Sequence, residues 1–223
     1  MGILLLVRHG QASFGAADYD RLSTAGHHQA RRAGAALAAA GLVPTRIVQG
    51  TLRRHRETTA AITEGGGWHH AATDDADWNE FDHLAVLRTA GYDLETLTDR
   101  RTFQAAFDKA VALWHADHGG PWPERWPGFA ARTTGALARA AATAGPGEVV
   151  LVVSSAGPIA AACAADLESA AEQWHLLDAE RWRRFNTVLV NTSLTRILVG
   201  TAGPRLLTFN EHQHLTATEV TYR

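Results

Sequence analysis

The chain has 223 residues, of which 46% are hydrophobic and 20% charged, and its formal net charge at pH 7 is −2. This length allows a sizeable buried core, and we expect a single domain over residues 1–223. The near-neutral charge argues against a nucleic-acid or membrane-surface partner, so any strong anion site must be local. No apolar run reaches the ~20 residues of a membrane span.

The expected location is cytoplasmic. Arg8 interrupts the only apolar segment near the N-terminus, which therefore lacks the features of a secretion signal. Cys163 is the only cysteine and cannot form an intrachain disulfide, which fits a reducing compartment.

The first predicted element is a strand over residues 4–7. This apolar run has no polar alternation, which is typical of a strand buried on both faces of a parallel sheet. Arg8, His9 and Gly10 follow it directly. Ligands of open α/β sheets bind beyond the carboxyl ends of the strands, so this triplet marks a candidate site.

A loop is expected over residues 14–19, and then a helix that ends near residue 40. Ser23 is a suitable N-cap for this helix, and Gly41 a suitable C-terminal stop. A short strand is predicted at 47–49, followed by a helix over 52–63. The first turns of that helix carry three arginines: Arg53, Arg54 and Arg56. Cations there oppose the helix dipole, and a bound anion would remove the conflict.

The middle of the chain differs in composition. Gly65, Gly66 and Gly67 predict a break, and residues 68–128 hold five of the seven tryptophans. Helices are expected at 102–117 and 129–143. The section is too short and irregular for a core of its own, so we expect an insert that packs over the sheet edge.

The last third contains the clearest strand, at 148–155. Pro158 lies near the first position of the helix that follows, and a strand, tight turn and helix N-terminus form an anion-binding geometry. A further helix is expected at 168–184. Closing strands are predicted at 186–190, 194–199 and 206–209. The alternation of elements predicts an α/β three-layer sandwich, with a mostly parallel central sheet flanked by helices.

Five stretches, in order along the chain, resemble the histidine phosphatase superfamily, which includes cofactor-dependent phosphoglycerate mutases and many phosphomonoesterases. The first is Leu6-Val7-Arg8-His9-Gly10. Residues 22–30 resemble the pattern Leu-Ser/Thr-x-x-Gly-x-x-Gln-Ala, and residues 50–58 resemble Ser-Pro-Leu-x-Arg-Ala-x-Gln-Thr. Residues 79–82 resemble the segment that carries the family's acid, and residues 152–159 the segment that carries its second histidine.

The resemblance implies a phosphoglycerate mutase-like fold, with an inserted helical lid at about residues 68–128. It also implies phosphoryl transfer without a cofactor or a metal. His9 would attack phosphorus to give a phosphohistidine, and a backbone carbonyl after the strand is expected to hold its other ring N–H. Arg8 and Arg54 would bind phosphate oxygens through planar, two-point contacts.

Glu80 is the predicted general acid and base, with Asp82 and Glu57 as competing candidates. A neighbouring dianionic phosphate would raise the pKa of Glu80 and help it to act as an acid. Gln11 and Ser13 lie in the loop after the first strand and are candidate hydrogen-bond donors to phosphate or substrate.

The departure from the family pattern that matters for the chemistry is at Ser155. The family has Ser-His-Gly-Gly where this chain has Ser154-Ser155-Ala156-Gly157. The Ser155 hydroxyl and the amides of Ala156 and Gly157 can still donate to phosphate, so we expect a working but slower or specialised phosphatase. Losing one well-placed donor typically costs ~10²–10³ in rate. His214 could replace the lost imidazole, but a histidine on the surface is the favoured interpretation of this residue.

Three other functions are alternatives to a phosphatase. A hydrolase with Ser154 or Ser155 as nucleophile lacks the Gly-x-Ser-x-Gly pattern. A phosphate-binding pseudo-enzyme would explain Ser155, and a mutase would need extra cations in the lid. The His212/His214 and His115/His118 pairs lack a third ligand at zinc spacing, so no metal is expected.

The predicted partner is a small-molecule phosphomonoester, and a homodimer is left open. Tryptophans of the insert favour an apolar pocket wall, with packing of an irregular segment as an equal alternative. We predict a phosphatase rather than a mutase.

Overall fold

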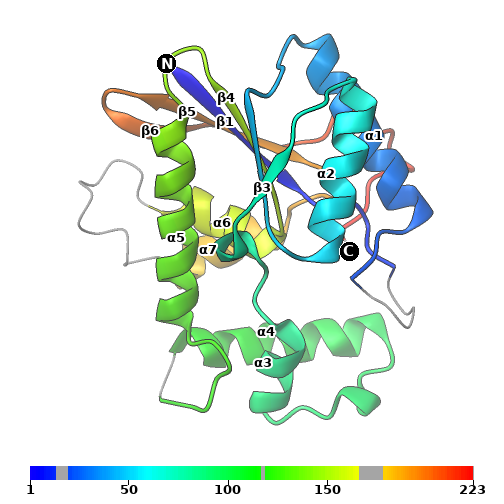
Figure 1. Ribbon diagram of the computed structural model, residues 1–223. Helices are drawn as coiled ribbons and strands as arrows, with labels where there is room; N and C mark the ends of the chain where they lie inside the picture. The colour runs from blue at the N-terminus through cyan, green and yellow to red at the C-terminus, as the bar shows by residue number, and fades with distance from the viewer. Residues whose placement is uncertain (14–19, 117–118, 166–177, 223) are drawn as a thin grey trace. The chain divides into compact units, whose positions relative to one another are not determined.

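The computed structural model describes residues 1–13, 20–116, 119–165 and 178–222 (Figure 1). The chain divides into two compact units. The first combines Met1–Glu80 with Thr133–Arg223, and the second is Phe81–Arg132. Residues 68–80, which the sequence placed in the insert, belong to the first unit because a strand within them joins the sheet.

The first unit is built on a six-stranded sheet with the order β3-β2-β4-β1-β5-β6. The strands are β1 (Gly2–Arg8), β2 (Arg46–Gln49), β3 (Ala72–Asp74), β4 (Val149–Ser154), β5 (Leu194–Gly200) and β6 (Gly203–Glu211). The four strands from β3 to β1 run parallel, and β5 runs antiparallel to both of its neighbours, β1 and β6. The prediction of a mostly parallel sheet flanked by helices is confirmed.

The described residues form seven α-helices and two short 3₁₀ helices. The α-helices are α1 (Thr24–Ala39), α2 (Arg53–Gly66), α3 (His83–Thr89), α4 (Arg100–Ala116), α5 (Trp126–Thr143), α6 (Ala156–Ala164) and α7 (Ala179–Asn186). The 3₁₀ helices are η1 (Ala76–Trp78) and η2 (Leu94–Thr96). Helices α3, η2 and α4 lie within the second unit.

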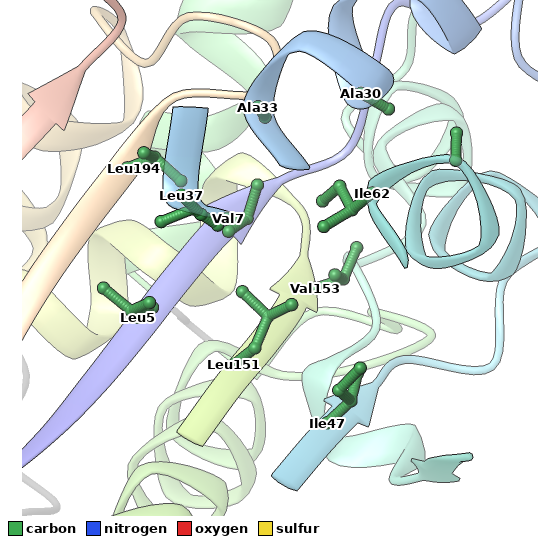
Figure 2. Packing of buried hydrophobic residues seen from close by; sticks show 11 residues of the cluster. Leu5, Val7, Ala30, Ala33, Leu37, Ile47, Ile62, Leu151, Val153 and Leu194 are labelled. Carbon is green, nitrogen blue, oxygen red and sulfur yellow. The ribbon is translucent and has the colours of Figure 1, made fainter. Parts of the chain in front are cut away.

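Helices α1 and α2 cover one face of the sheet (Figure 1). Alternate residues of the strands point to that face and are buried against small and branched side chains of the two helices (Figure 2). This core contains Leu5, Val7, Ala30, Ala33, Leu37, Ile47, Ala61, Ile62, Leu151, Val153 and Leu194. Helix α6 packs against β1 on the other face, and the indole Nε1 of Trp182 in α7 donates to the carbonyl of Gly157 in α6 (2.9 Å).

The predicted ends of α1 are confirmed. Ser23 accepts a hydrogen bond from the amide of Gly26 (3.0 Å), and Gly41 has the positive φ of 70° that ends the helix. Helix α2 ends within the predicted glycine break, at Gly66, and Gly67 follows it with a positive φ of 69°. A Cβ atom on Gly65 would lie 2.1 Å from the carbonyl oxygen of Arg31, so this glycine permits close packing on α1.

The predicted strand at 186–190 is wrong. Helix α7 ends at Asn186, and the following backbone is held by side chains and by the C-terminal segment. The amide of Val190 donates to Asn210 Oδ1, and the amide of Asn191 donates to the carbonyl of Thr221, both at 2.9 Å. The predicted strands at 194–199 and 206–209 are confirmed. The predicted loop at 14–19, and residues 168–177 of the predicted helix 168–184, lie outside the described residues.

The second unit has an aromatic core. The ring of Trp114 packs on Phe81 (centroids 4.5 Å apart) and on Trp126 (5.2 Å), and Trp126 packs on Phe129 (5.7 Å). Trp114 also donates from Nε1 to the carbonyl of Glu124 (2.7 Å). These two tryptophans therefore pack the interior of the unit, which is the packing role weighed against a pocket wall.

Candidate active site

The site lies where three parallel strands end side by side. The amide of His9, just after β1, donates to the carbonyl of Ser154 at the end of β4 (2.8 Å). The amide of Gly50, just after β2, donates to the carbonyl of Val153 (3.1 Å). Residues that follow β1, β2 and β4 are thus brought to one edge of the sheet, as the sequence predicted for the first and last of these strands.

His9 is held in one orientation and one tautomer. Its Nδ1 lies 2.7 Å from the carbonyl oxygen of Gly10, and a carbonyl can only accept, so Nδ1 carries the hydrogen and Nε2 keeps a lone pair. The predicted carbonyl partner is confirmed. Burial, followed by the charges of Arg54 and Arg8, lowers the pKa of His9 well below 6.5. The imidazole is therefore neutral near pH 7.

Backbone contacts fix the segment that carries His9. The amide of Gly10 donates to the hydroxyl of Thr58 in α2 (3.0 Å). The Nδ2 of Asn191 donates to the carbonyl of His9 (3.0 Å), and the amide of Thr192 donates to the carbonyl of Arg8 (3.0 Å). Thr192 has a positive φ of 59°, a conformation uncommon for a residue with a side chain. Sequence reasoning missed Asn191 and Thr192.

Arg54 lies in the first turn of α2 and is largely buried, with 9% of its surface exposed. Its Nη1 donates to Asp20 Oδ1 (2.6 Å), and its Nη2 lies 3.4 Å from Ser155 Oγ. Asp20 Oδ2 also accepts from the amide of Arg53, the first residue of α2 (2.7 Å). The conflict between arginines and helix dipole is therefore relieved by a carboxylate of the chain itself.

Arg8 ends β1 and is also buried. Its Nη1 donates to the carbonyl of Leu189 (2.5 Å) and its Nη2 to the carbonyl of Tyr222 (2.9 Å). These contacts fix the plane of the guanidinium group close enough to His9 to lower the pKa of the ring.

Ser155 is the N-cap of α6 and is fully buried, and Ala156 and Gly157 form the first turn of that helix. Its hydroxyl oxygen lies 2.8 Å from Nε2 of His55, a fully buried residue of α2. The His55 ring centroid is 5.9 Å from that of His9. Sequence reasoning did not find His55.

Glu80 reaches the same helix terminus. The amide of Gly157 donates to Glu80 Oε2 (3.1 Å). The segment before it is fixed by the Ser154 hydroxyl, which donates to the carbonyl of Trp78 (2.6 Å). Asn79 Oδ1 accepts from the amide of Thr51 (2.7 Å), so the loops after β2 and β3 are tied together.

The competing carboxylates have structural roles. Glu57 accepts from the amide of Leu22 (2.7 Å) and pairs with Arg53 (2.6 Å). Asp82 caps α3 by accepting from the amide of Ala85 (2.9 Å).

The remaining candidates from the sequence are Gln11, Ser13 and His214, and the structure gives each of them a contact within the chain. Gln11 Oε1 accepts from the hydroxyl of Ser23 (3.0 Å), and the amide of Ser13 donates to the carbonyl of Arg21 (2.9 Å). His214 Nε2 lies 3.1 Å from Thr192 Oγ1, so the imidazole that contacts Ser155 belongs to His55.

The chain belongs to the histidine phosphatase superfamily (branch 1), whose family model matches residues 4–212. A search of curated protein sequences returns no match.

Two solved structures illustrate the similarity. A mycobacterial glucosyl-3-phosphoglycerate phosphatase is 25% identical with a TM-score of 0.62, over 94% of this chain and 99% of that one. A phosphoserine phosphatase mutant from Entamoeba histolytica, in complex with phosphoserine, is 17% identical with a TM-score of 0.66, over 97% of this chain and 100% of that one. The phosphoglycerate mutase-like fold is therefore confirmed.

Among residues 1–13, 20–116, 119–165 and 178–222, every helix is too short or too polar to cross a lipid bilayer. In the same part of the chain, no group of three or more His, Cys, Asp or Glu side chains could hold a metal ion.

Proposed function

We propose that this chain is a phosphatase that hydrolyses a small-molecule phosphomonoester through a phosphohistidine on His9. The observation that carries the proposal is the tautomer of His9, whose Nδ1–H is held by Gly10 so that Nε2 is a free nucleophile. The lowered pKa of His9 keeps Nε2 unprotonated near pH 7. The two similar proteins of solved structure described above are phosphatases, which supports hydrolysis over mutase chemistry.

In the first step, His9 Nε2 attacks phosphorus and the P–O ester bond breaks. Glu80 gives its proton to the leaving alkoxide, while Arg54 and Arg8 offset charge on the phosphoryl oxygens. The proton on His9 Nδ1 stays in its bond to Gly10, and the phosphorylated ring carries the positive charge.

In the second step, water attacks the phosphorus of the phosphohistidine. Glu80, now a carboxylate, takes a proton from that water, the N–P bond breaks, and inorganic phosphate leaves. His9 returns to its neutral form and Glu80 to its acid form, so the cycle needs no cofactor and no metal.

A test is steady-state hydrolysis of p-nitrophenyl phosphate, together with rapid acid-free quenching and detection of base-stable, acid-labile phosphoprotein. We expect turnover and labelling in the wild type, and loss of both in His9→Ala, by about 10⁴-fold or more in kcat. Phosphate binding without turnover or labelling would contradict the proposal in favour of a pseudo-enzyme. Transfer to a second phosphoester in preference to water would favour a mutase.

A further inference from the structure

The contact between His55 and Ser155 joins two fully buried polar side chains at the proposed phosphate site. His55 Nε2 lies 2.8 Å from Ser155 Oγ, and Arg54 Nη2 lies 3.4 Å from the same oxygen. Buried polar atoms are normally kept only where they are hydrogen-bonded, so this contact is a built feature of the site.

The direction of the hydrogen bond follows from the other ring nitrogen. His55 Nδ1 is buried and makes no hydrogen bond to the part of the chain that the structure describes. A buried N–H without a partner is rarer and more costly than a buried acceptor without one. The hydrogen therefore belongs on Nε2, which donates to Ser155 Oγ.

The donors around Ser155 decide where its own proton points. A guanidinium group can only donate, so Ser155 Oγ accepts from Arg54 and from His55. A hydroxyl has two lone pairs and one hydrogen. With both lone pairs occupied, the Ser155 proton is left to donate to a third group.

Gly50 makes room for this arrangement. A Cβ atom on Gly50 would lie 2.1 Å from Nδ1 of His55, so a larger residue would displace the ring. The family pattern has serine, alanine and histidine where this chain has Gly50, His55 and Ser155. Of these three departures from the pattern, His55 lies against both of the others, Gly50 and Ser155.

We propose that His55 is a positioning residue that orients the Ser155 hydroxyl to donate to the phosphoryl group in transfer. The imidazole missing from the end of β4 is supplied from α2, and it acts through one intervening hydroxyl. This inference rests on the proposed phosphatase function. The low pKa of His55, caused by burial and by Arg54, keeps the ring neutral, so the relay is a chain of neutral donors.

The test compares kcat and KM for p-nitrophenyl phosphate in His55→Ala, His55→Gln, Ser155→Ala and the double variant His55→Ala/Ser155→Ala. Removing the relay should lower kcat about 100-fold in each alanine variant, with KM changed less than about threefold. The double variant should be no slower than either single one, because the two residues act as a unit. The glutamine amide can donate from nearly the same place, so His55→Gln should recover about tenfold over His55→Ala.

His28→Ala is the control, because His28 is exposed and pairs with Glu219. It should keep the activity of the wild type. Unfolding of each variant, monitored by circular dichroism, distinguishes a loss of folded protein from a loss of kcat. If His55→Ala does not fold, the proposal requires that Ser155→Ala loses about 100-fold while His55→Gln stays within about tenfold of the wild type.

Several outcomes separate the two proposals. A kcat for folded His55→Ala within about threefold of the wild type, with His9 still labelled, would overturn the role of His55 alone. Equal losses in folded His55→Gln and His55→Ala would do the same. Phosphate trapped on Ser155 instead of His9, or no turnover by the wild type, would overturn the proposed function.

Discussion

At the scale of single residues, the two arginines of the site are held in place by other groups of the chain. The guanidinium group of Arg54 is fixed by Asp20 and faces Ser155, and that of Arg8 is fixed by backbone carbonyls. Such fixed donors need no reorganisation as charge develops on phosphoryl oxygens, which makes them effective in the transition state.

Arg54→Lys tests whether this geometry matters beyond charge. Lysine keeps the positive charge but loses the planar fork, so it cannot contact Asp20, Ser155 and phosphate together. We expect kcat/KM to fall about 10- to 100-fold, the equivalent of one or two charged hydrogen bonds. Phosphate-release kinetics would measure the change.

Arg56→Lys is the matched control, because Arg56 lies in the same helix but is exposed and pairs with Asp74. It should retain wild-type kinetics. An equal loss in both variants would mean that α2 had been disturbed and that the fork of Arg54 is not the cause.

The residues of the site could be predicted only in part. His9, Arg54 and Ser155 stand at strand ends or in ordered motifs, and their proximity was foreseen. His55 was missed because a single polar residue in a helix gives no signal by itself. Its spacing to Thr58 and Ile62, both buried, does place it on the inner face of α2 and could have marked it.

At the scale of elements, the close approach of α1 and α2 depends on glycine. A Cβ atom on Gly34 in α1 would lie 2.0 Å from the carbonyl oxygen of Ile62 in α2. Because α2 carries both Arg54 and His55, the spacing of these helices also sets the position of these two side chains relative to β1.

Gly34→Ala should therefore destabilise the protein by about 1–3 kcal/mol, the usual cost of overpacking. Gly135→Ala in α5 is the matched control. The new methyl group there would meet only Arg139 Nη1, at 3.5 Å, so higher helix propensity should stabilise by up to about 1 kcal/mol. Urea denaturation would measure both. Equal effects would contradict the account of the α1–α2 packing.

Elements with a complete local signal were predictable, and elements defined by distant partners were not. β1 and β4 are continuous apolar runs, and α1 has a cap at each end. Residues 187–193 contain apolar side chains but owe their conformation to Asn210 and to the C-terminal segment. No local pattern encodes such contacts.

At the scale of the whole molecule, the net charge of −2 conceals a local concentration of cations around buried imidazoles. His9 and His55 are both held neutral, mainly by burial, with pKa values well below 6.5. Burial, with Arg32 next in effect, also lowers the pKa of His214 to about 4. All three histidines bind protons more readily in the unfolded chain than in the folded one.

This imbalance predicts how stability depends on pH. Below pH 6.5 these three histidines bind protons in the unfolded state but stay neutral in the folded state. The free energy of unfolding should therefore fall as the pH drops from 7.5 to 5. His214→Gln removes one of these groups. Between pH 7.5 and pH 5, the free energy of unfolding of His214→Gln should therefore fall by about 1–2 kcal/mol less than the free energy of unfolding of the wild type.

Urea denaturation at pH 7.5 and pH 5 would measure the difference, with His70→Gln at an exposed position as the control. The low pKa of Glu219, about 2 and caused first by hydrogen bonds from Thr216, adds a loss of stability only below about pH 4.5, outside this range. The same pH dependence in wild type and His214→Gln would contradict the buried, neutral state of His214. If the free energy of unfolding of the wild type did not change between pH 7.5 and pH 5, the buried, neutral states of His9 and His55 would be contradicted as well. The proposed chemistry depends on the neutral state of His9, which is its nucleophile.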